Sequence, residues 1–140
     1  MPAAPQSVGY SGTPLARKLG IKPGERVVAR GAPENYEELL DPIPENVVVS
    51  PRLAAANRFI HLFVRRKATL EKEFAHLASR LERDGMLWVS WPKKASGVLT
   101  EVDEAIVRAT GLANGLVDVK ICAVDETWSG LKFVYRVEDR

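Results

Sequence analysis

The chain has 140 residues, 46% of them hydrophobic and 27% charged, which suits one globular domain with its own core. The 20 Lys and Arg residues nearly balance 18 Asp and Glu, and this excludes a dedicated nucleic-acid-binding protein. The single cysteine excludes an internal disulfide. Together with only two histidines, it gives too few ligands for a usual structural zinc site.

The N-terminal residues and the length of the apolar segments predict the location of the protein in the cell. Residues 1–8 are rich in Pro and Ala, carry no signal-peptide pattern, and are expected to form a disordered or extended tail. The longest aliphatic and aromatic stretch, 59–64, is far shorter than the roughly 20 residues of a membrane span. We therefore expect a cytoplasmic protein with one α/β domain over 9–140 and no membrane partner.

Turn-forming residues divide the chain into alternating helices and strands. The helix over 68–83 has the clearest pattern, because its apolar residues recur on one helical face. Thr100 is expected to begin the next helix, with Asp103 in a variant of the capping box. The expected elements, in chain order, are a helix over 14–19, a strand over 26–29, a helix over 34–40, strands over 47–49 and 59–64, the helix over 68–83, a strand over 86–91, a helix from 100, and strands over 117–124 and 131–137.

This order predicts a three-layer sheet. Strands that alternate with helices form a mostly parallel sheet, and the short link 125–130 makes the last two strands an antiparallel hairpin. The order resembles the class I methyltransferase-like variant of the Rossmann fold, as do the segments 19–27 and 84–89. We expect an α/β fold: a three-layer Rossmann-like (methyltransferase-like), mostly parallel sheet with a C-terminal antiparallel hairpin.

That resemblance implies S-adenosylmethionine, held by an acid and a Gly-x-Gly loop after the first strand and by an acid after the second. Here Arg30 and the segment Gly31-Ala32-Pro33 follow the first strand, and Ser50 follows the second. Since a fold does not grant a function, we expect no cofactor and predict that S-adenosylmethionine does not bind measurably.

A second resemblance covers nearly the whole chain. The segments 9–15, 91–97 and 125–133 are similar to a family of small bacterial proteins catalogued as domain of unknown function 3052. The resemblance implies a single-domain bacterial protein and no particular activity.

The candidate site lies at the carboxyl edge of the expected sheet, where open α/β sheets bind ligands. The loops 91–97 and 125–130 should be neighbours at this edge, and the start of the first helix should point back toward them. The candidate ligand-binding residues are Ser11, Thr13, Lys93, Lys94, Ser96, Asp125, Glu126 and Trp128.

Two interpretations of these residues stay open. The lysines and the helix start suit a small anionic ligand such as a phosphate or carboxylate, with Trp128 against a planar group. Alternatively, Lys93 or Lys94 pairs with Asp125 or Glu126 and joins the loops, while Trp128 covers the core.

Our favoured function is a non-catalytic binding module with an anionic-ligand or partner site. One alternative is a small enzyme that uses Asp125 or Glu126 with Lys93 or Lys94, and another is a homodimeric interaction protein. We assign no catalytic or metal-binding residue. His61 is interpreted as a core residue, and the basic segment 65–67 as the solvated start of a helix rather than a nucleic-acid site.

Overall fold

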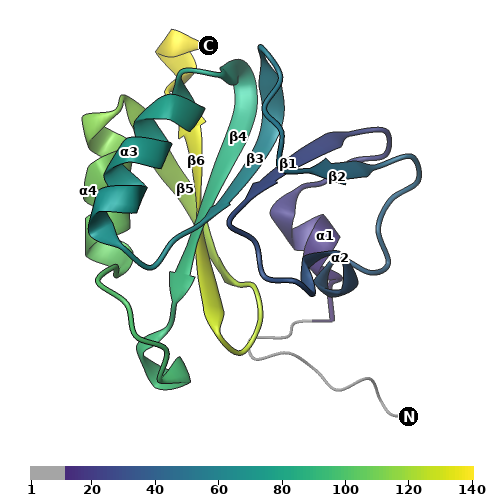
Figure 1. Ribbon diagram of the computed structural model, residues 1–140. Helices are drawn as coiled ribbons and strands as arrows, with labels where there is room; N and C mark the ends of the chain where they lie inside the picture. The colour runs from purple at the N-terminus through teal and green to yellow at the C-terminus, as the bar shows by residue number, and fades with distance from the viewer. Residues whose placement is uncertain (1–11) are drawn as a thin grey trace.

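A single mixed sheet organises residues 12–140, which the computed structural model describes (Figure 1). Its order is β2-β1-β3-β4-β6-β5; the first four strands are parallel, and β6 is antiparallel to both neighbours. The strands are β1 (Arg26–Arg30), β2 (Val48–Ser50), β3 (Asn57–Phe63), β4 (Leu81–Pro92), β5 (Leu116–Ala123) and β6 (Trp128–Tyr135). The expected fold class, with its C-terminal antiparallel hairpin, is confirmed.

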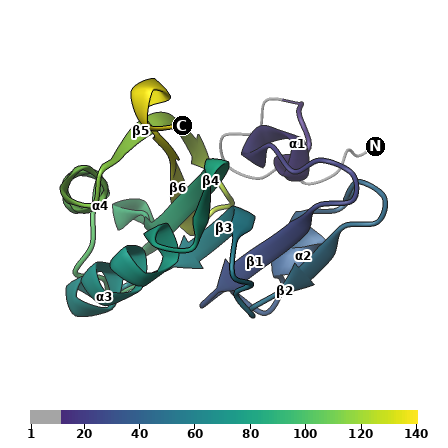
Figure 2. The same cartoon turned by 90° about the horizontal axis from the view of Figure 1, so that it is seen from above.

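Helices cover both faces of the sheet, as Figure 2 shows from above. On one face α3 (Lys67–Ala78) and α4 (Glu104–Ala113) bury a core against β3, β4 and β6. On the other face α1 (Leu15–Leu19) and α2 (Tyr36–Leu39) bury a second core against β1, β3 and β4. No helix within 12–140 is long and apolar enough to cross a membrane.

The strand β3 belongs to both cores. Ile60 and Leu62 pack under α3, whereas Phe59 and Phe63 pack toward α1 and α2. Side chains on successive strand residues point to opposite faces, so a strand covered on both sides must be apolar nearly throughout. This explains why residues 59–64 are apolar at every position except His61.

Two expected helix bounds are wrong. The helix α3 ends at Ala78 rather than near Arg83, because the following segment already pairs with β3: Asn57 donates to the carbonyl of Arg80, and Leu81 pairs with Asn57. The helix α4 begins at Glu104, and Asp103 is its N-cap, accepting from the amide of Ile106 at 2.9 Å. The apolar spacing that placed Leu81 on a helix fits its buried position in a strand equally well.

Candidate functional site

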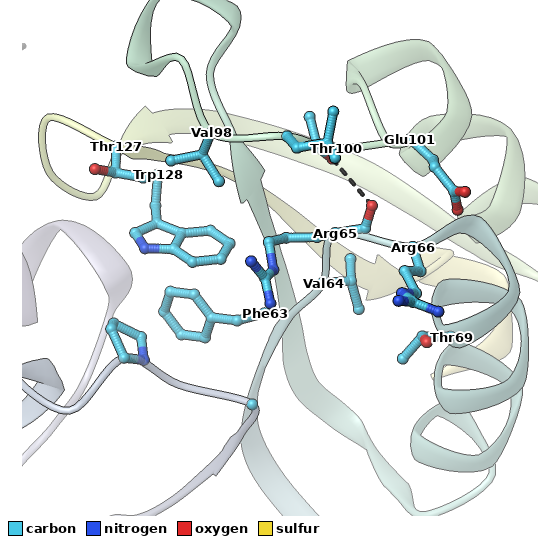
Figure 3. Close-up of a pocket in the computed structure, with 13 residues that line it drawn as sticks. Phe63, Val64, Arg65, Arg66, Thr69, Val98, Thr100, Glu101, Thr127 and Trp128 are labelled. Carbon is cyan, nitrogen blue, oxygen red and sulfur yellow. Dashed lines mark hydrogen bonds between the residues drawn. The ribbon is translucent and has the colours of Figure 1, made fainter.

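A pocket of about 830 Å³ lies at the carboxyl edge of the sheet (Figure 3). The strand order reverses there, because β2 and β3 lie on opposite sides of β1. Such switch points are where open α/β sheets bind ligands. The segments after β1, β3 and β4 and the β5–β6 hairpin contribute its lining: Gly31, Pro33, Phe63, Val64, Arg65, Arg66, Thr69, Val98, Leu99, Thr100, Glu101, Thr127 and Trp128.

One wall of this pocket is aromatic. The rings of Phe63 and Trp128 are nearly perpendicular, with centroids 5.0 Å apart (Figure 3). Phe63 is buried at the end of β3, and Trp128 is half-buried at the start of β6. The wall is therefore anchored in two strands and presents rigid apolar surface to a ligand.

The part of the lining next to this wall carries positive charge. Arg65 and Arg66 follow β3 and are exposed, and neither forms an ion pair with another residue of the described chain. Figure 3 shows the side chain of Arg65 directed toward Phe63 and that of Arg66 toward Thr69. Two guanidinium groups thus remain available to a ligand in this pocket.

The segment 98–101 is bonded across the mouth of the pocket. The hydroxyl of Thr100 donates to the carbonyl of Arg65 at 3.2 Å, and the amide of Glu101 donates to the same carbonyl at 2.8 Å. The Glu101 carboxylate accepts from the amide of Lys67 at 3.0 Å, where α3 begins. These bonds hold the backbone of Arg65 in place and leave its side chain free.

The turn after β1 requires glycine at position 31. Gly31 has φ +69°, which L side chains rarely adopt. A Cβ there would lie 2.7 Å from the carbonyl oxygen of Phe63. The turn therefore passes directly against the end of β3, beside the aromatic wall.

A second pocket, of about 200 Å³, lies on the other side of this turn, between the ends of β1 and β2. Pro33 lines both pockets, so they adjoin. The side chains of Glu34 and Glu37 are exposed at its rim, and neither forms an ion pair within residues 12–140. The methyltransferase resemblance implies an acid after β2, where this chain has Ser50. Carboxylates lie beside Ser50 all the same, because the segment after β1 brings Glu34 and Glu37 to the same pocket.

Below the aromatic wall lies a buried polar cluster. His61 is fully buried, with Nδ1 2.8 Å from the Tyr36 hydroxyl and Nε2 2.7 Å from Ser90 Oγ. Its ring stacks on Phe63 with centroids 4.2 Å apart. Burial lowers the pKa of His61 to about 3 and raises the pKa of Tyr36. Both groups are therefore neutral at pH 7. The cluster packs behind the wall: Tyr36 lines the smaller pocket, and His61 and Ser90 line neither.

The loops 91–97 and 125–130 are neighbours, as predicted. The amide of Lys93 donates to the carbonyl of Thr127 at 2.8 Å, and Lys93 Nζ donates to the carbonyl of Asp125 at the same distance. The Asp125 carboxylate accepts from the amides of Thr127 and Trp128. Lys93 and Asp125 thus stabilise the hairpin through backbone contacts rather than as an ion pair.

The other predicted site residues lie apart from the pocket, with one exception. Trp128 lines it, whereas Thr13, Lys94, Ser96 and Glu126 do not. The Ser96 hydroxyl donates to Lys93 and accepts from Val98, within its own turn. Ser11 and the tail over 1–8 lie outside the described residues. A ligand-binding role for these residues stays a prediction.

Sequence reasoning missed four charged residues. Arg65 and Arg66 were assigned to a solvated helix start, and Glu34 and Glu37 were not considered. A usable signal existed for the arginines, because they follow a parallel strand and must lie at the carboxyl edge. No signal in the sequence placed the glutamates beside β2, since this depends on the path of the turn after β1.

This chain is similar to solved structures in its fold, whereas no family model matches it and no curated protein matches its sequence. A solved structure of an S-adenosylmethionine-dependent methyltransferase from Aquifex aeolicus has 13% identity, covers 85% of this chain and 86% of its own, and gives a TM-score of 0.60. Magnesium protoporphyrin IX methyltransferase from Synechocystis PCC 6803, with bound S-adenosylmethionine, has 14% identity, coverages of 87% and 74%, and a TM-score of 0.56.

A third neighbour, fibrillarin from Aeropyrum pernix with natively bound S-adenosylmethionine, has 15% identity, coverages of 90% and 70%, and a TM-score of 0.52. These neighbours correct two expectations, the non-catalytic binding module and the absence of S-adenosylmethionine. The sequence argument gave one missing glycine motif more weight than the architecture, whereas several proteins that share this architecture are methyltransferases, and several have this cofactor or its product bound. The chain has the methyltransferase-like Rossmann fold.

Proposed function

We propose that this protein binds S-adenosylmethionine around the Gly31–Pro33 turn and transfers its methyl group to a small acceptor in the 830 Å³ pocket. The observation that carries the proposal is the position of this pocket at the β1/β3 switch point of the sheet. The fold and its neighbours support the same reaction class. A cytoplasmic location and membership in the bacterial family suggested by 9–15, 91–97 and 125–133 remain predictions.

The residues at this edge fit the cofactor. The carboxylates of Glu34 and Glu37 at the smaller pocket are acceptors for the two ribose hydroxyl groups. The larger pocket is at the upper end of the size range of small-molecule sites, so it has room for the reacting groups and an acceptor. The fit rests on these carboxylates and this volume, because the turn has one glycine where the methyltransferase loop has two.

When bound, S-adenosylmethionine supplies a methyl group on a positively charged sulfonium, which a nucleophile can displace. The chain contributes orientation. Phe63 and Trp128 form an apolar wall, and the bonds of Thr100 and Glu101 to the carbonyl of Arg65 hold the segment 98–101 against the end of β3. Holding two reactants in one oriented site is itself a large part of catalysis.

The test is isothermal titration calorimetry with S-adenosylmethionine and S-adenosylhomocysteine. We expect the parent to bind with a Kd on the order of 10 μM. The double variant Glu34→Gln, Glu37→Gln should bind about tenfold more weakly, because each carboxylate offers a charged acceptor. Glu38→Gln is the matched control, since Glu38 is exposed on the same helix and lines neither pocket.

Two results would overturn the proposal. One is the absence of binding by the parent at about 1 mM of either nucleoside. The other is equal affinity of the parent and the double variant, because the cofactor would then lie away from the β1–β2 crevice.

A further inference from the structure

We infer that the methyl acceptor is a planar aromatic carboxylate, with its ring against the wall of Phe63 and Trp128 and its carboxylate held by Arg65, while Arg66 adds positive charge to the same side. With S-adenosylmethionine bound, a carboxylate oxygen would form the bond to the methyl carbon as the bond between that carbon and the sulfonium sulfur breaks, and S-adenosylhomocysteine would leave. This inference rests on the proposed function, because it names the acceptor for the same pocket. It uses residues on the β3 and β6 side of the site, whereas the cofactor residues lie on the β1 and β2 side.

The aromatic wall favours a ligand with a flat, apolar ring. Phe63 and Trp128 meet edge to face at 87°. Phe63 is only 4% exposed and packs behind Trp128, so the half-buried Trp128 ring supplies most of the surface that a ligand can reach. Aromatic groups prefer such offset and perpendicular neighbours. Leu99, which is 91% exposed at the rim, adds apolar surface on the segment bonded across the mouth.

The two guanidinium groups select an oxyanion. A guanidinium presents a planar fork of N–H donors that matches the two oxygens of a carboxylate. Arg65 is directed toward the aromatic wall in Figure 3, so an anion bound to it lies beside any ring that packs there. Thr69, toward which Arg66 is directed, adds a hydroxyl group to this side of the pocket, whereas the hydroxyl of Thr100 already donates to the carbonyl of Arg65.

The net charge of the pocket lining favours a carboxylate over a phosphate monoester as the bound anion. Its ionisable side chains are Arg65, Arg66 and Glu101, which gives two positive charges against one negative, a net charge of +1. A carboxylate, with a single negative charge, neutralises this lining. A phosphate monoester carries nearly two negative charges at pH 7 and would leave the pocket with an uncompensated charge.

The test is a titration with salicylate, followed by the indole N–H resonances of the three tryptophans in ¹⁵N-labelled protein. The variant Trp128→Phe assigns the Trp128 resonance. We expect salicylate to shift this resonance with a Kd on the order of 1 mM, as suits so small a ligand. Benzyl alcohol, which lacks the charge, and acetate, which lacks the ring, should each bind at least about tenfold more weakly.

Variants of the two arginines then test whether these side chains bind the carboxylate of salicylate. The double variant Arg65→Ala, Arg66→Ala should weaken salicylate binding about tenfold, because it removes the charged donors. Lys72→Ala is the control: it removes one positive charge from the exposed side of α3, outside the pocket. Since both arginines are exposed and unpaired among residues 12–140, the double variant should fold, which its ¹⁵N spectrum will show directly.

Salicylate binding that leaves the Trp128 resonance unchanged, or that survives loss of both arginines, would overturn the inference. Tighter binding of phenyl phosphate than of salicylate would overturn the choice of a carboxylate. The titration contains no S-adenosylmethionine, so it is independent of the calorimetry. Cofactor binding without salicylate binding refutes the acceptor class alone, and salicylate binding without cofactor binding refutes the proposed function alone.

Discussion

His61 places an ionisable ring at the centre of the sheet, between the hydroxyls of Tyr36 and Ser90. The cluster is fully hydrogen-bonded, and burial lowers the pKa of the ring to about 3. An unfolded histidine has a pKa near 6.5. Between these two values the unfolded chain binds a proton that the native chain does not, so the free energy of unfolding rises with pH in this range.

The stability of the protein should therefore fall on acidification. From pH 6 to pH 4 we expect His61 to reduce the free energy of unfolding by about 2.5 kcal/mol, since one proton contributes about 1.4 kcal/mol per pH unit. In His61→Gln, urea unfolding at the same pH values should lack this part of the dependence. His76→Gln, which replaces an exposed histidine of α3, is the control. Equal pH dependence in the parent and His61→Gln would contradict the assignment.

At the scale of elements, the β5–β6 hairpin is joined to the end of β4 through Lys93. Its ammonium group donates to the carbonyl of Asp125, while the Asp125 carboxylate is used within the turn. Lys94 is exposed and forms no ion pair in the described part of the chain. The two adjacent lysines, which the sequence could not distinguish, thus have different roles.

This difference predicts unequal effects of two matched substitutions. Lys93→Ala should lower the free energy of unfolding by about 1 kcal/mol, because it leaves a half-buried carbonyl without its donor. Lys94→Ala should change it by less than about 0.5 kcal/mol, as is usual for an exposed side chain. Urea denaturation measures both, and equal losses would show that the contact of Lys93 does not join the loops.

Elements were predictable where a pattern is local, and the site was not. Repeated apolar spacing located α3, a nearly continuous apolar segment located β3, and the short link after β5 identified the hairpin. The end of α3 was misplaced because Leu81 is buried equally well on a helix or a strand. The pocket depends on which strand ends meet: Arg65 lies there because it follows a parallel strand, whereas Glu34 reaches β2 only through the path of the turn after β1.

For the whole molecule, the two cores share one sheet. β3 contributes to both, and the Trp88 side chain donates from β4 to the carbonyl of Leu19 at the end of α1. If either helical layer separated from the sheet, it would expose the face of these shared strands that it covers, and so weaken the sheet on which the other layer packs. We therefore expect one cooperative unfolding transition, as is usual for single domains of this size.

A cofactor bound at the switch point should move that transition as a whole. The proposed cofactor site includes the turn after β1, which packs against β3, and a ligand that binds only the native state stabilises it. At a hundredfold excess over its Kd, S-adenosylhomocysteine should add about 2.7 kcal/mol to the free energy of unfolding. For a chain of this length that corresponds to a rise in Tm of about 8 °C.

Far-ultraviolet circular dichroism and tryptophan fluorescence should report the same rise in Tm. The Glu34→Gln, Glu37→Gln variant should show a smaller rise at the same concentration of S-adenosylhomocysteine. A rise in Tm reported by only one of these two methods would contradict a single transition. It would mean that the ligand stabilises one core and leaves the other to unfold separately.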